Sequence, residues 1–143
     1  MLKGINWVAV IVASVLVFLL GYVWYVMLFQ APWDAALVGA TLKPALSETT
    51  AMAVGFVNIV IISAGLAWVI DRLGATSVLG AVIVAFAVWF FFDFTTMLVD
   101  YLYVGLSRDL VAINMGYQLA SYLLTGAVLG LMKSRPSALA AAT

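Results

Sequence analysis

The stretch AVWFFFDFTTMLV (Ala87–Val99) decides how this chain folds. It belongs to an apolar run, Val78–Val99, and it places one ionisable residue, Asp93, inside that run. A helix needs about 20 apolar residues to cross a bilayer. Three more runs of that length occur along the chain: Trp7–Phe29, Ala51–Ile70 and Leu110–Met132. We therefore predict an all-α fold, a transmembrane four-helix bundle.

The composition of the whole chain agrees with this prediction. Its 143 residues are 67% hydrophobic and 8% charged, whereas soluble domains average about 25% charged residues. A chain with so few charges cannot cover a water-exposed surface, so a water-soluble globule is excluded. The four runs leave no room for a second domain, and we expect one transmembrane domain over residues 1–135 and a flexible tail over 136–143.

The connections between the runs also carry information. We expect Pro32 to end the first helix, because proline has no N–H to donate. The segment Gln30–Thr50 repeats apolar residues near helical spacing, which predicts a short interfacial segment between the first two spans. Gly74 suits the left-handed position after a helix. The short link around it makes the second and third spans antiparallel neighbours.

Basic residues predict the orientation of the chain. With four spans, one side of the membrane carries four basic residues and the other carries two, Lys43 and Arg108. The positive-inside rule places the richer side in the cytoplasm. We therefore expect a multi-pass protein of the inner (cytoplasmic) membrane with both termini cytoplasmic. The four basic residues on the side expected to be cytoplasmic are Lys3, Arg72, Lys133 and Arg135.

Missing residue types limit the chemistry. The chain has no histidine and no cysteine, which excludes histidine-ligated haem, zinc and iron–sulfur sites, cysteine nucleophiles and disulfides. We expect no metal site, no cofactor and no enzymatic activity. The net charge is zero, so no nucleic-acid partner is indicated.

An acidic residue inside a membrane span costs at least ~2.5 kcal/mol to insert, which makes Asp93 a candidate functional residue. Polar side chains of the other helices fall at a similar depth, so we predict a polar pocket around it. In one interpretation the pocket binds a cation, a proton or a small polar headgroup. In the other, Asp93 accepts hydrogen bonds that lock the helices together. The candidate residues are Asp93, Asn58, Asn114, Gln118, Trp24, Tyr25 and Tyr117.

Two further patterns concern contacts. Gly126 and Gly130 form a GxxxG motif, which allows close helix packing within the chain or along a dimer seam. The block Trp89–Phe94 holds five aromatic residues in six positions. Such a block packs against other helices or faces lipid, and a cage for a pigment or a quinone is the less favoured alternative.

Several short motifs combine aromatic, glycine and asparagine residues within the apolar runs: Asn6-Trp7-x-Ala9-Val10, Gly21-x-x-Trp24-Tyr25, Trp33 with Gly39, and Asn114-x-Gly116-Tyr117-x-Leu119. With these motifs the chain resembles the DUF1761 family of small bacterial membrane proteins. The resemblance implies a four-span membrane protein of uncharacterised function, with Trp24, Tyr25, Asn114 and Tyr117 as site candidates.

Three functions fit these patterns. The first is a non-enzymatic accessory, scaffold or small-ligand-binding subunit. The alternative is a small oligomeric transporter or channel with Asp93 in a cation or proton path. A membrane enzyme would have to rely on Asp93, Asp100 and tyrosines, and is the weakest of the three. Besides the lipid bilayer, the partner we expect is a second copy of the chain or a larger membrane complex.

Overall fold

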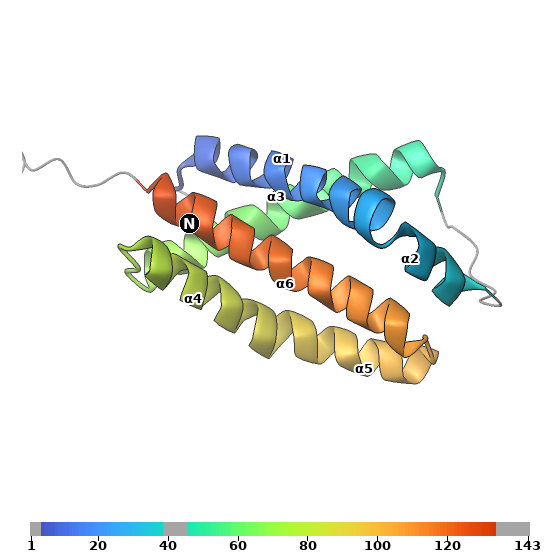
Figure 1. Cartoon of the computed structure of the whole chain (residues 1–143). Coiled ribbons are helices and arrows are strands. Elements are labelled where there is room, and N and C mark those ends of the chain that lie inside the picture. Colours follow the sequence, from blue (N-terminus) through green and yellow to red (C-terminus); the bar gives the residue numbers. More distant parts are fainter. Residues whose placement is uncertain (1–3, 39–45, 134–143) are drawn as a thin grey trace, which may run out of the picture.

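The computed structural model describes residues 4–38 and 46–133, and every regular element in these ranges is helical (Figure 1). The all-α prediction is therefore confirmed for the described residues. The predicted tail 136–143 lies outside them, as do Lys3, Lys43 and Arg135. In chain order the elements are α1 (Trp7–Tyr22), η1 (Val23–Leu28), α2 (Gln30–Leu37), α3 (Glu48–Arg72), α4 (Val78–Val88), η2 (Trp89–Phe94), α5 (Thr95–Val104) and α6 (Arg108–Leu131); η1 and η2 are π-helical turns.

Within the described ranges, three helical segments are long and apolar enough to cross a membrane: Trp7–Leu28, Glu48–Arg72 and Val78–Val104. Large apolar side chains are widely exposed on them, for example Ile61 and Leu79. A soluble monomer rarely exposes apolar surface so extensively. Helix α6 is long enough, with 24 residues, but it carries more polar side chains.

Helix α6 is the central element of the fold. Figure 1 shows it between α1 on one side and the continuous rod α4–η2–α5 on the other, with α3 crossing α1. Accordingly, α6 contacts α1, α2, α3, α4 and η2. This position explains its composition, because polar side chains on a helix that is covered by other helices do not have to face lipid.

The helix boundaries follow local rules of capping. Asn6, Ser47, Ser77 and Ser107 each accept a hydrogen bond from the N–H three residues later, at the starts of α1, α3, α4 and α6. At the end of α3, Gly74 has the expected left-handed conformation, with φ of 66°. These caps satisfy backbone donors and acceptors that the helix itself leaves free.

The end of the first helix differs from the prediction. The helix stops at Leu28, before Pro32, and the N–H of Phe29 donates to the carbonyl of Trp24 at 2.9 Å, which closes a wide π-helical turn. Helix α2 then begins at Gln30. Pro32 therefore lies in the first turn of α2, where a missing N–H breaks no helical hydrogen bond.

The GxxxG motif packs within the chain. A Cβ atom added at Gly126 would lie 2.8 Å from the Cβ of Ala85 and 3.0 Å from the carbonyl oxygen of Ala81. One added at Gly130 would lie 2.8 Å from the Cα of Val78. Both glycines thus let α6 approach α4, and of the two interpretations of the motif the structure supports close helix packing.

This contact predicts a large effect of Gly126→Ala. The added methyl group has no room, so we expect the free energy of unfolding in detergent to fall by about 1–3 kcal/mol, the usual cost of overpacking. The matched control is Gly65→Ala in α3, where an added Cβ meets no atom within 4 Å. Thermal unfolding of both variants measures the difference. Equal stability of the two would refute close α4–α6 packing.

Candidate functional site

Two consecutive aromatic side chains of the π-turn η1 reach across to α6. The indole Nε1 of Trp24 donates to the carbonyl of Ile113 at 3.0 Å, and the hydroxyl of Tyr25 donates to Oδ1 of Asn114 at 2.8 Å. Gly116 makes space for this approach, because a Cβ there would lie 3.0 Å from the Trp24 ring. Turn η1 is thereby tied to α6 at two points.

Asn114 continues the connection to α5. Its Nδ2 donates to the hydroxyl of Tyr101 at 3.0 Å, so one amide bridges phenols from two other elements. Tyr117, one turn further along α6, lies with its ring centroid 5.1 Å from that of Tyr25. We call Trp24, Tyr25, Tyr101, Asn114 and Tyr117 the aromatic–amide cluster. Four of them were predicted; Tyr101 was missed, because nothing in its sequence surroundings singles it out.

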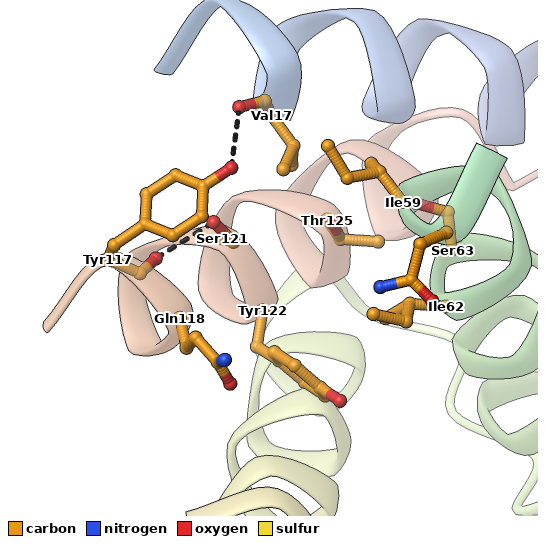
Figure 2. Close-up of a pocket in the computed structure, with 10 residues that line it drawn as sticks. Val17, Ile59, Ile62, Ser63, Tyr117, Gln118, Ser121, Tyr122 and Thr125 are labelled. Carbon is orange, nitrogen blue, oxygen red and sulfur yellow. Dashed lines mark hydrogen bonds between the residues drawn. The ribbon is translucent and has the colours of Figure 1, made fainter. Parts of the chain in front are cut away.

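A second group of polar side chains lines a partly open hollow between α1, α3 and α6, shown in Figure 2, with a volume of about 110 Å³. Its polar residues come from α3 and α6. We call this hollow the polar pocket. Its lining consists of Val17, Ile59, Ile62 and Tyr117 together with Asn58, Ser63, Gln118, Ser121, Tyr122 and Thr125.

Ser63 is the most informative residue of the polar pocket. Its side chain is 1% exposed, and its hydroxyl has no hydrogen-bond partner among the described residues. The neighbouring Ser121, by contrast, donates to the carbonyl of Tyr117 at 2.8 Å, as the dashed line in Figure 2 shows. The sequence analysis missed Ser63. No spacing signal could have found it, because Ser63 is five residues from Asn58 and only residues three or four apart are neighbours on a helix face.

Tyr117 stands between the two groups. Its ring packs in the aromatic–amide cluster and also lines the polar pocket. Its hydroxyl donates to the carbonyl of Val17 at 3.3 Å, and a Cβ at Gly21 would lie 3.1 Å from that hydroxyl oxygen. Gly21 therefore lets the phenol reach the backbone of α1.

Asp93 lies on η2 and is not among the residues that line the polar pocket, which include three of the seven predicted residues, Asn58, Tyr117 and Gln118. Its Oδ2 atom is buried without a hydrogen-bond partner among the described residues, and the same holds for Nε1 of Trp89 on the same π-turn. The pocket residue Tyr122 is close enough to interact with Asp93 electrostatically. The expected closure of polar groups around Asp93 therefore stays a prediction: Asp93 lies on η2, which contacts α6, whereas Asn58 lines the polar pocket from α3.

The bridging role of Asn114 can be tested by a double-mutant cycle. We expect Tyr25→Phe and Asn114→Leu to show a coupling free energy of about 0.6–1.7 kcal/mol, the range of interhelical hydrogen bonds in membranes. The control cycle pairs Asn114→Leu with Tyr22→Phe, since Tyr22 is exposed on the same helix. Unfolding in detergent gives the four stabilities of each cycle. Zero coupling in the first cycle would show that the Tyr25–Asn114 bond contributes nothing to stability.

The comparisons with known proteins agree with the resemblance seen in the sequence. Searches of curated proteins and of solved structures give no match. One family model, described as a protein of unknown function (DUF1761), matches residues 8–130, which include the aromatic–amide cluster and the polar pocket. The chain therefore belongs to the DUF1761 family.

Proposed function

We propose that this protein is a non-enzymatic membrane protein that binds a small ligand in the polar pocket. The observation that carries the proposal is the Ser63 hydroxyl, buried and without a partner among the described residues. Leaving a buried donor or acceptor unsatisfied costs about 1–3 kcal/mol. A ligand atom that hydrogen-bonds to Ser63 removes that cost, so the pocket favours an occupant with polar atoms.

The lining of the pocket supports binding better than catalysis. The amides of Asn58 and Gln118 each offer two N–H donors and one acceptor oxygen. Ser63, Thr125 and Tyr122 add hydroxyl groups. None of these groups is a strong general acid or base near neutral pH. They can, however, recognise a ligand by the positions of its donors and acceptors.

Native mass spectrometry of the protein purified from its own membranes in mild detergent tests the proposal. We expect the wild-type protein to carry a bound small molecule that the double variant Ser63→Ala/Gln118→Leu loses, because its hydrogen bonds are gone. Ser14→Ala is the control. Ser14 is also fully buried, but its hydroxyl donates to the carbonyl of Val10 within its own helix at 2.8 Å.

Two results would overturn the proposal. One is a wild-type protein without any bound molecule, which would mean that water alone fills the pocket. The other is a bound molecule that all three proteins retain equally, which would place the ligand elsewhere.

A specific observation favours a second candidate function, transport of a cation or a proton by an oligomer. Asp93 has a buried carboxylate oxygen without a partner among the described residues, and it lies in a π-turn, a distortion that is frequent at functional sites. Four spans are few for a pathway within one chain, so this function requires several copies.

Flux measurements in proteoliposomes test this candidate. We expect proton or K⁺ flux that Asp93→Asn abolishes and Asp100→Asn leaves unchanged. Asp100 is the control because it is exposed and lies seven residues further along the same rod. Absence of proton and K⁺ flux in the wild type, or equal flux in both variants, would exclude Asp93 from an ion path.

A further inference from the structure

A large apolar groove lies beside the polar pocket. Its volume is about 640 Å³, which falls in the usual range of roughly 300–1,000 Å³ for ligand sites. The polar pocket, at about 110 Å³, is below that range and holds only a headgroup or a few waters. We call the larger hollow the lateral groove. It is lined from α1, η1, α2, α3 and α6 by residues that include Phe18, Tyr22, Val26, Trp33, Met52 and Gly55.

The lateral groove and the polar pocket adjoin each other. Both are lined by Ile59 of α3 and by Tyr117 of α6, so these two side chains form the boundary between them. Along α3 the groove extends from Glu48 to Ile59, and the pocket follows from Asn58 to Ser63. A molecule that reaches from one into the other would place an apolar part against the groove and a polar part beside Ser63.

We propose that the ligand is a neutral, lipid-soluble amphiphile whose apolar chain lies in the lateral groove and whose hydrogen-bonding head enters the polar pocket past Tyr117. This inference rests on the proposed function and specifies the class of ligand. It also implies entry from the bilayer rather than from water, because the groove is apolar and lies on helices with exposed apolar surfaces.

The charge of the lining argues for a neutral head. Every polar residue of the pocket is an amide, a hydroxyl or a phenol. A phosphate would need cationic partners or several aligned donors to offset its desolvation. The one carboxylate along the groove, Glu48, stands at the start of α3, the far end from the pocket.

Depth argues against an ordinary phospholipid. Ser63 lies roughly 22 Å along α3 from Glu48, at 1.5 Å per residue, in a helix of 25 residues. If α3 spans the bilayer, the pocket lies well inside the hydrocarbon layer. Phospholipid headgroups stay at the interface, whereas an alcohol or a carbonyl on an apolar chain can reach this depth at much lower cost.

Gly55 offers a way to block the groove without disturbing the fold. It lines the groove, and an added Cβ there meets no atom within 4 Å. Gly55→Leu therefore starts a side chain in open space at the wall of the groove. Gly65→Leu is the matched control, because Gly65 lies on the same helix, also has open space, and lines neither hollow.

The test is photo-crosslinking in nanodiscs with a monoacylglycerol that carries a diazirine in its acyl chain. We expect this neutral probe to label groove residues of α1 and α3. Labelling there should fall about tenfold in Gly55→Leu, equivalent to ~1.4 kcal/mol of binding free energy, and stay at the wild-type level in Gly65→Leu. A diazirine-bearing phosphatidylcholine should label lipid-facing residues equally in all three proteins.

Equal labelling of the two glycine variants by the monoacylglycerol would overturn the inference, and so would groove labelling by phosphatidylcholine that Gly55→Leu removes. The inference can also fail while the proposed function holds. A native ligand that Ser63→Ala/Gln118→Leu loses but Gly55→Leu retains would leave the pocket a binding site and refute only the amphiphile in the groove.

Discussion

The rest of the structure depends on the close approach of α4 and α6. Gly126 and Gly130 bring the two backbones so near that no side chain fits between them. With α4 held on one side, α6 presents its other faces to α1, α2 and α3. Its polar residues then face other helices, where membrane proteins place them, instead of the lipid. The close contact at Gly126 and Gly130 thus makes the polar helix α6 compatible with an apolar exterior of the bundle.

Two π-turns, η1 and η2, interrupt the α-helices of this framework. Turn η1 widens the helix where Trp24 and Tyr25 both need to reach α6, and the structure shows both side chains bonded there. Turn η2 contains Asp93 and Trp89, each with a buried polar atom that has no partner among the described residues. The polar side-chain atoms of Trp24 and Tyr25 in η1 are thus hydrogen-bonded to α6, whereas Nε1 of Trp89 and Oδ2 of Asp93 in η2 have no partner among the described residues. This contrast fits a structural role for η1 and a functional role for η2.

The polar pocket and the lateral groove together suggest how a small bundle could recognise a membrane-dissolved molecule. The helices supply hydrogen-bonding groups at depth, where water does not compete for them, and an apolar path that the bilayer itself can fill. Tyr117, which borders both, donates a long hydrogen bond of 3.3 Å to the carbonyl of Val17 in α1. A weak bond at this boundary suits a side chain that moves aside when a ligand passes.

The amino-acid sequence by itself determined the class of the fold, because apolar runs of bilayer length, serine and asparagine caps and a glycine after α3 act locally. Through the resemblance to the family it also pointed to Trp24, Tyr25, Asn114 and Tyr117 as site candidates. Only the tertiary structure decided that Asp93 does not line the polar pocket, that Ser63 is buried without a partner among the described residues, and where the π-turns fall. Those features depend on which helix faces meet. Packing between side chains that are far apart in the sequence decides which faces meet, and local spacing does not encode this packing.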